Sequence, residues 1–487
     1  MLKTRKKLAT MAVAAAVSGG ALMSGAVQAL NVSQNNVGEV LLFPYYTVKN
    51  GLDTVFTVTN TTNKTAAFKI RFREALNSRE VRDFNVVLSP YDHWSGAVTA
   101  VGSGAAVRTF DKSCTSPDKP AWTASGTGYQ VDFTNALFSG IYGDGGDTDI
   151  SRVKEGYFEV ILMGVSSRDP SVSSNVVEYN AKHVAGVPRS CAKVDEAFLN
   201  TGSSDWAGFI APENVLKGHV TYIDVATGKS MDAEPTAIED FKSGSTNADD
   251  ILSAPGNASP DLNSGDLTGT VHVISDGVAI ATPYTGGSAN GVSMALMATS
   301  VINEFSAGTG AATSWVVTFP TKHHFTDAYD LTLGTITNST VYAPFTHRFV
   351  GDADGTGKSC DTIGMSLFNR EEGTVTTVSN NGFSPQPPVD TSVSLCYEAN
   401  VINFNASSNV FGAGTNRLTV DTSAVGTAGW AKLSFTSTAA TTAANRTGPY
   451  VGLPVIGFAA VMRDAGSASV NYGSNLEHAY VSGARAN

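Results

Sequence analysis

The sequence predicts a mainly β protein, built of antiparallel β-sandwich-like domains with a few short helices. Large apolar residues alternate with polar ones in several segments, as in 68–73 (FKIRFR), and a period of two is typical of half-buried strands. Other segments, such as 54–59 (TVFTVT), are dense in β-branched residues and end near Gly, Pro or Asn. Segments with helical periodicity are few, so strands should dominate the fold.

The first strands expected along the chain are 54–59, 68–73 and 84–88, and Pro90 ends the third of them. Residues 60–64 (NTTNK) have the length and composition of a hairpin loop. We therefore expect three consecutive antiparallel strands, the usual opening of a sandwich. In the second strand, the alternation should place the apolar side chains on a buried face and the three cations in water.

Similar patterns predict strands at 157–163, 219–225, 270–274, 315–319, 392–397, 432–435 and 455–461. The best helix candidate is 293–305 (SMALMATSVINEF), with Ser293 as its expected N-cap. Residues 233–241 are a weaker helix candidate. Between these elements, residues 242–268 are rich in Ser, Gly, Asn, Asp and Pro, which is typical of a linker or a long surface loop. The predicted organisation is therefore a β-rich domain at 30–241, this linker, and a second β-rich domain at 269–487.

The N-terminus has the pattern of a signal peptide. Four basic residues at positions 3–7 precede an apolar stretch at 8–17, and Val27 and Ala29 occupy the −3 and −1 positions of a predicted cleavage site. A transmembrane anchor is the alternative, but a spanning helix needs about 20 apolar residues, and this run is interrupted at 18–20. We expect residues 1–29 to be removed and the mature chain to be exported to the periplasm, the cell surface or the medium, with no transmembrane helix.

The mature chain is acidic. Removal of residues 1–29 takes away four basic and no acidic residues, which changes the formal net charge from −11 to −15. Such a chain repels nucleic acid and anionic lipid, and no cluster of Lys and Arg opposes this charge. Nucleic acid is therefore excluded as an expected partner.

All four cysteines lie in the mature chain, and none belongs to a CxxC motif. In an oxidising compartment two disulfides are expected, although four cysteines allow three pairings. Pairing of sequence neighbours would join Cys114 to Cys191 and Cys360 to Cys396, with one bridge in each half.

Several phrases resemble a group of uncharacterised exported proteins of proteobacteria. They are 38–46 (GEVLLFPYY), 182–188 (KHVAGVP), 315–321 (WVVTFPT), 395–398 (LCYE) and 452–458 (GLPVIGF). The resemblance extends through most of the mature chain and implies an exported, full-length, non-modular protein. It implies no activity.

Candidate metal ligands are few. The segment 352–357 (DADGTG) starts like many calcium loops, so Asp352 and Asp354 are the predicted calcium ligands, but position 363 is Ile where an EF-hand has Glu. A second acidic loop, 143–149, offers three further carboxylates, although Asp and Gly are also ordinary turn residues. His323 and His324 form the only close histidine pair, and both could reach one metal only from a loop. No other cofactor is expected.

Signatures of catalysis are absent from the sequence. GxSxG, HExxH, GxGxxG and the Walker motif do not occur. Paired carboxylates for glycoside hydrolysis remain open because their spacing is spatial, with Glu39, Glu371 and Glu372 as nominal candidates. The five tryptophans could contribute to a sugar-binding platform, although Trp315 lies on an apolar strand and should be core.

Three functional classes follow from these observations. The first expectation is a non-enzymatic structural or surface-associated protein that contacts itself or other surface components within an extracellular assembly. The alternatives are a secreted polysaccharide-binding protein and, with less support, a secreted hydrolase. The segment 30–46, polar and then apolar, should be an internal strand; the alternative is a donor strand that pairs with a neighbouring molecule.

Overall fold

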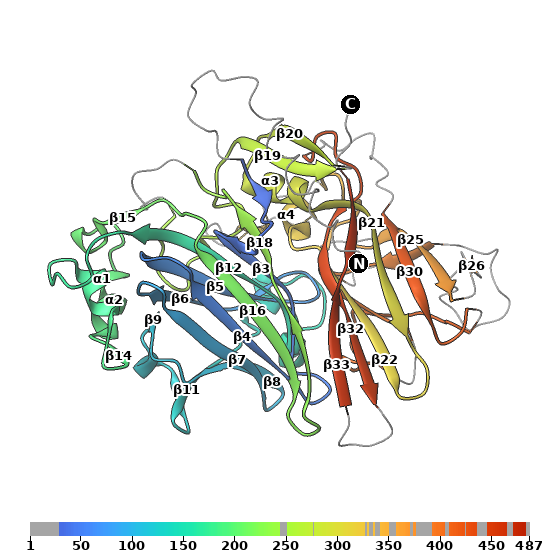
Figure 1. Ribbon diagram of the computed structural model, residues 1–487, viewed down its shortest axis with the longest axis horizontal. Coiled ribbons are helices and arrows are strands. Elements are labelled where there is room, and N and C mark those ends of the chain that lie inside the picture. Colours follow the sequence, from blue (N-terminus) through green and yellow to red (C-terminus); the bar gives the residue numbers. More distant parts are fainter. Residues whose placement is uncertain are drawn as a thin grey trace, which may run out of the picture.

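A computed structural model describes most of the chain after residue 28. The described residues are 29–243, 251–275, 277–326, 329–330, 335–336, 341–349, 357–370, 374–375, 392–404, 409–423, 425–435, 446–464 and 471–483. Strands dominate this part, as predicted, and they form two sandwiches side by side (Figure 1).

Two sheets build the N-terminal sandwich. In spatial order, sheet 1 contains β1 (Asn31–Val32), β18 (Thr236–Glu239), β3 (Val40–Thr47), β12 (Glu155–Ser166), β5 (Thr65–Glu74), β6 (Glu80–Leu88) and β9 (Cys114–Ser116), and β15 (Phe209–Ile210) pairs with β12. Sheet 2 contains β10 (Thr123–Ser125), β11 (Gly128–Asp132), β8 (Gly104–Thr109), β7 (His93–Val101), β4 (Leu52–Asn60), β16 (Leu216–Asp224) and β17 (Lys229–Ala233), and β2 (Val37–Gly38) pairs with β16.

Two further sheets build the C-terminal sandwich. Sheet 3 contains β26 (Thr374–Val375), β25 (Asp361–Asn369), β30 (Ala428–Phe435), β21 (Met297–Ser306) and β31 (Leu453–Pro454), with β27 (Ser392–Leu395) on β25 and β34 (Ala479–Ser482) on β21. Sheet 4 contains β29 (Arg417–Thr419), β28 (Ala399–Asn403), β22 (Ala311–Thr318), β32 (Ile456–Asp464) and β33 (Asn471–Glu477). Among the described strand pairs, only β28 and β29 run parallel.

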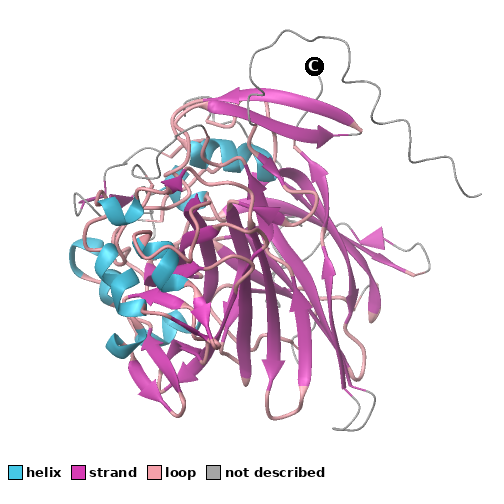
Figure 2. Cartoon of the chain, turned by 60° about the vertical axis from the view of Figure 1, so that its left-hand side comes forward, coloured by secondary structure: helices cyan, strands magenta, loops and turns pink. Residues whose placement is uncertain are grey.

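Small elements complete the fold. Two-stranded sheets are β13 (His183–Val184) with β14 (Val187–Pro188), β19 (Gly269–Ser275) with β20 (Val278–Tyr284), and β23 (Tyr329–Asp330) with β24 (Thr335–Ile336). The α-helices of the described part are α1 (Val176–Ala181), α2 (Cys191–Ala197), α3 (Ser288–Leu296) and α4 (Lys322–Thr326), and single 3-10 turns lie at Lys119–Ala121, Ala136–Phe138, Gly140–Tyr142, Ile150–Lys154 and Ser204–Trp206. Figure 2 shows helices gathered at one side of the strands and beneath the β19–β20 hairpin. No helix of the described residues is both long and apolar enough to span a bilayer.

One hydrophobic core fills the N-terminal sandwich and continues into sheet 4. Its centre is a group of aromatic rings that includes Phe43, Phe56, Phe72 and Phe158, and complete burial of such a ring contributes about 1.5–3 kcal/mol. The same core contains side chains of β22, β28 and β32, such as Val316, Val401 and Phe458. The opposite face of sheet 4 packs against sheet 3 through residues such as Trp315. Sheet 4 is therefore buried on both faces and shared by the two sandwiches.

The predicted hairpin at 54–73 is wrong, although both of its strands exist. β4 pairs with β7 and β16 in sheet 2, and β5 pairs with β6 and β12 in sheet 1. Both edges of each strand are satisfied by other partners, so residues 60–64 cross from one sheet to the other. β3 likewise lies between β18 and β12, so the apolar part of the segment 30–46 is an internal strand.

The helix predicted at 293–305 is correct only in its first four residues, and the weaker helix candidate at 233–241 is wrong. Residues 297–306 form β21, and only 293–296 belong to a helix, which begins at Ser288. In β21, Val301 and Phe305 are four residues apart and both are buried on the inner side of the strand. Ile302 and Glu304, which lie between them in sequence, point to the other side. The β-branched residues fit this period of two as well as they fit a helix. Residues 233–241 contain β18, which is held between β1 and β3.

The cations of β5 do not lie in water, which corrects a further expectation. Lys69, Arg71 and Arg73 are buried because residues 251–261 cross the outer face of sheet 1. The Nζ of Lys69 lies 2.6 Å from Asp83 Oδ2 and donates to the Asn257 carbonyl at 2.9 Å. The described part of the predicted linker is therefore a covering layer held by buried charges.

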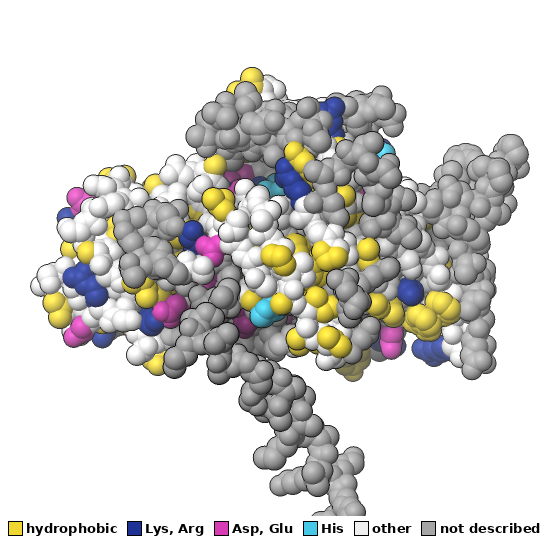
Figure 3. All heavy atoms as spheres, turned by 90° about the horizontal axis from the view of Figure 1, so that it is seen from above, with side chains coloured by type: hydrophobic (Ala, Val, Ile, Leu, Met, Phe, Trp, Pro, Cys, Tyr) yellow, Lys and Arg dark blue, Asp and Glu magenta, His cyan; other side chains and the backbone are white. Residues whose placement is uncertain are grey.

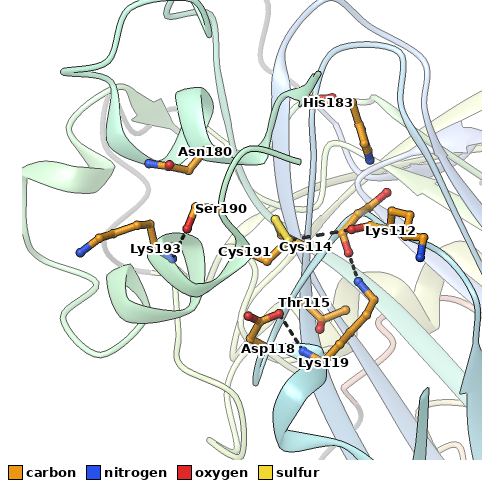
Figure 4. Close-up of a disulfide and its surroundings, with 12 residues drawn as sticks. Lys112, Cys114, Thr115, Asp118, Lys119, Asn180, His183, Ser190, Cys191 and Lys193 are labelled. Carbon is orange, nitrogen blue, oxygen red and sulfur yellow. Dashed lines mark hydrogen bonds between the residues drawn. A yellow bond between two sulfur atoms is a disulfide. The ribbon is translucent and has the colours of Figure 1, made fainter. Parts of the chain in front are cut away.

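The predicted disulfide pairing is confirmed. Cys114 of β9 bonds to Cys191 at the start of α2, and Cys360 bonds to Cys396. Figure 4 shows the first bridge tying α2 to the edge of sheet 1, with Ser190 Oγ accepting a hydrogen bond from the Lys193 amide as the N-cap of α2. The helices α1 and α2 thereby extend the covering layer.

Candidate ligand-binding cleft

A cleft of about 950 Å³ lies where the two sandwiches meet the β19–β20 hairpin. Three walls surround it. The N-terminal wall comes from residues 31–34, Asn36, Pro44, His219 and 232–236; the hairpin wall from 272–274 and Ala279; and the C-terminal wall from 295–298, 455–458, Asn475, Glu477, Tyr480 and Ser482. The hairpin lies above the junction in Figure 1, and the face seen from above in Figure 3 shows hydrophobic patches with charges of both signs scattered between them.

The position of the cleft follows from the way β17 and β33 meet. At Gly473 the two strands touch so closely that a Cβ atom would lie 2.1 Å from the Ser230 carbonyl oxygen. Glycine is needed at this point because any side chain would separate the strands. Further along, Asp232 and Glu234 on one side and Asn475 and Glu477 on the other line the cleft. The contact at Gly473 is therefore the closed end from which the two walls diverge.

The C-terminal wall turns a rigid corner at His478, between β33 and β34. The buried imidazole contacts the Asn303 amide nitrogen through Nδ1 at 2.9 Å and the Val316 carbonyl through Nε2 at 3.0 Å. Desolvation lowers the pKa of His478 to about 4, so the ring is neutral, and Nε2 carries the proton that is donated to Val316. Asn303 also donates to the carbonyls of Leu476 and Glu477 at 3.0 and 3.1 Å. These contacts fix the side chains on either side of the corner.

Tyr480 lies directly after this corner and presents its ring to the cleft. Its hydroxyl donates to the Gly457 carbonyl at 3.0 Å, and its ring meets His478 edge-on with centroids 6.1 Å apart. Desolvation, with a smaller contribution from the Glu477 carboxylate, raises the pKa of the phenol, which therefore remains a donor. The residue is nevertheless 39% exposed and lines the cleft, so a ring held by this hydrogen bond forms part of the wall.

The charges of the cleft are few and mostly paired. Among its described lining residues none is a lysine or an arginine. Asp232 accepts a hydrogen bond from Thr221 at 2.5 Å and lies 3.5 Å from His219 Nε2, and Glu234 lies 3.8 Å from Lys217 and accepts from Asn36. Glu477 is exposed and has no side-chain partner within the described part. The cleft thus carries a weak negative charge centred on one carboxylate.

Asn475 gives the cleft an unsatisfied polar group. Both the nitrogen and the oxygen of its side-chain amide are buried, and neither has a hydrogen-bond partner among the described residues. Leaving a buried polar group unpaired costs about 1–3 kcal/mol, and native structures usually pair such groups with protein, water or ligand. Asn475 is therefore the wall residue whose side chain would gain most from an added hydrogen-bond partner.

The predicted acidic loops have different outcomes. Asp352 and Asp354 lie outside the described residues. The carboxylate of Asp144 binds Arg152, with Oδ2 2.5 Å from NH2, and accepts from Asn77, while Asp147 and Asp149 cap backbone amides. Within the described ranges, no group of three His, Cys, Asp or Glu residues is arranged to hold a metal ion.

The histidine pair lies on α4 rather than in a loop. His323 Nδ1 is 2.6 Å from Glu398 Oε1, and the two imidazole rings are 4.0 Å apart. Desolvation lowers the pKa of both histidines well below the usual value and raises that of Glu398 to about 7. Ser78 bonds to Glu398, and its hydroxyl oxygen lies 2.8 Å from that of Tyr157. The cluster holds α4 against sheet 1.

The remaining sequence candidates are mostly structural. Glu39 is buried and accepts the Lys242 amide at 2.8 Å, and Glu371 and Glu372 lie outside the described residues. Trp94, Trp122, Trp206 and Trp315 are buried. Trp430 is 38% exposed and stacks on Phe368 on the outer face of sheet 3, with centroids 3.8 Å apart.

Most cleft residues could not be predicted from the sequence because they come from segments far apart in the chain. The segment 471–482 (NYGSNLEHAYVS) alternates polar and other residues weakly and was not expected to form strands. Asn31, Ser33, Gln34 and Asn36 belong to the segment that the sequence predicted as a strand, and their place in the N-terminal wall was not predicted.

Comparison with known proteins gave no match to a family model, to a curated protein or to a solved structure.

Proposed function

We propose that the protein is an exported, non-enzymatic binding protein of the cell surface, and that the cleft between its sandwiches holds the ligand. The observation that carries this proposal is a cleft of about 950 Å³, near the upper end of the 300–1,000 Å³ typical of small-molecule sites, with an unsatisfied amide in its wall. The two disulfides fit an oxidising compartment.

The geometry favours binding over hydrolysis. A glycoside hydrolase needs two carboxyl groups about 5–10 Å apart that are free to act on the substrate. Two of the three cleft carboxylates, Asp232 and Glu234, are engaged with side chains of the N-terminal wall. The buried core also argues against a donor-strand assembly, because β3 has partners on both edges.

A cleft-filling variant tests this proposal. Ala279 lines the cleft from β20, whereas the neighbouring exposed Val278 does not, so Ala279→Trp and Val278→Trp form a matched pair. Labelled mature protein should bind to the surface of the cells that produce it. Ala279→Trp should lose most of this binding, and Val278→Trp should keep it. Equal binding by both variants, or no binding by the unmodified protein, would contradict the proposal.

A further inference from the structure

The class of ligand can be narrowed from the walls of the cleft, if the proposed binding function holds. Charge gives the first restriction. Among the described residues no lysine or arginine lines the cleft and Glu477 has no partner, so a phosphate, a sulfate or a uronic acid would meet repulsion without a compensating lysine or arginine there. The charge of one carboxylate is too small to select a highly cationic ligand. An uncharged ligand fits best.

Hydrogen-bonding capacity gives the second restriction. An uncharged apolar ligand would not need the polar side chains that surround this cleft, among them Gln34, Asn475 and Glu477. Gln34 is exposed and, within the described part, has no side-chain partner. A carboxamide donates and accepts at once, and a carboxylate accepts twice, which together match the adjacent hydroxyl groups of a sugar ring.

Strand geometry places two of these groups beside the aromatic ring. Leu476 packs toward the core between sheets 3 and 4, so Asn475 and Glu477 project from the opposite face of β33. Tyr480 follows immediately after the corner at His478, and its ring is fixed by the Gly457 hydrogen bond. The C–H face of a pyranose can lie on such a ring while its hydroxyls reach the neighbouring polar groups.

We propose that the cleft binds an uncharged saccharide chain, with one pyranose ring on Tyr480 and its hydroxyls bonded to Glu477 and to the amide of Asn475, which turns from its buried position toward the ligand. Gln34 contacts the chain from the opposite wall. Asn475 gains the partner that it lacks in the free protein, so ligand binding relieves the cost of its buried amide.

Titration calorimetry of the full mature protein tests the assignment. The probes are neutral hexose and N-acetylhexosamine tetrasaccharides, a uronic acid tetrasaccharide and uncharged tetrapeptides. We expect a neutral tetrasaccharide to bind and the uronic acid tetrasaccharide to bind at least about tenfold more weakly. Tyr480→Ala should weaken saccharide binding about tenfold through loss of the ring, whereas Tyr480→Phe, which keeps the ring, should stay within about threefold.

Asn475→Leu separates a ligand contact from a structural role. Removal of an unsatisfied buried amide should leave the melting temperature of the free protein unchanged or higher, while saccharide affinity falls. A lower melting temperature with unchanged affinity would overturn the role of Asn475. Binding of the tetrapeptides in place of saccharides, abolished by Ala279→Trp, would overturn the ligand class and leave the proposed function standing. Saccharide binding that is unaffected by Ala279→Trp would overturn the site itself.

Discussion

Strands β4 and β5 follow one another in the chain, and both contain alternating apolar and polar residues. Their environments in the folded protein are nevertheless different. Along β4, buried residues alternate with half-exposed ones, whereas all ten residues of β5 are buried. The difference comes from residues 251–261, which cover the outer face of β5 and accept hydrogen bonds from its cations. Alternation therefore identifies the side of a strand that faces the core, but it does not tell whether the opposite side is covered.

The largest effect should come from breaking a charge pair under the covered face. Arg73 Nε lies 2.9 Å from Glu159 Oε1, and both side chains are buried. Arg73→Ala should lower the free energy of unfolding by about 3–5 kcal/mol, because it leaves the buried carboxyl of Glu159 without its partner. Urea unfolding measures this loss. Thr57→Ala on β4 is the control and should change stability by less than about 0.5 kcal/mol.

A double variant sharpens the same comparison. Arg73→Leu with Glu159→Leu removes both charges and should recover most of the stability lost in Arg73→Ala, since apolar pairs often replace buried ion pairs without loss. If the double variant is as unstable as the single one, the pair does more than neutralise two buried charges. It would then be needed to position the covering layer.

Removal of the bridge between α2 and sheet 1 should have the next largest effect. Cys114→Ala with Cys191→Ala opens a loop of 77 residues and should cost about 2–4 kcal/mol in thermal or urea unfolding. Proteolysis should then begin in the covering helices α1 and α2. Initial cleavage in the strands of sheet 2 instead would contradict the view of these helices as a separate layer over sheet 1.

Glu39, buried beneath residues 241–242, should make stability depend on pH. Desolvation raises its pKa to about 8, partly offset by hydrogen bonds from the Lys242 and Phe241 amides. The folded protein thus holds a proton that the unfolded chain releases near pH 4.5, so this group's contribution to stability falls as pH rises from about 4.5 to 8. Glu39→Gln should be nearly neutral at pH 5 and stabilising by about 1–3 kcal/mol at pH 9, as measured by urea unfolding. Equal effects at both pH values would refute the assignment.

The smallest effect is expected on the open face of sheet 2. Lys217 and Glu234 are each about half exposed and lie 3.8 Å apart. Lys217→Ala should change the free energy of unfolding by less than about 1 kcal/mol, because solvent screens such pairs. A larger loss in urea unfolding would mean that this face is also covered, for example by a bound molecule in the cleft.

The same contrast explains what the sequence could predict. The strands predicted from local patterns are all present, although many strands of the structure were not predicted. Pairing of sequence neighbours, one of the three pairings that four cysteines allow, is the pairing found. The boundary between α3 and β21 was missed because the apolar residues of 293–305 fit either period. The buried cations of β5 were missed because the residues that cover them lie about 185 positions further along the chain. The cleft was missed for the same reason, since its three walls meet only in the folded protein.

Sheet 4, enclosed by both sandwiches, sets an order of events for a chain that emerges from its N-terminus. The first core is lined by Ala237 of β18 but also by Ala460 of β32, which is made about 220 residues later. At translation rates of about 5–20 residues per second, that interval lasts roughly 10–45 s. During this time the N-terminal sandwich lacks one wall, and its aromatic interior borders on water. A chain with this architecture is therefore expected either to need a holding chaperone or to fold only after its C-terminal half has been made.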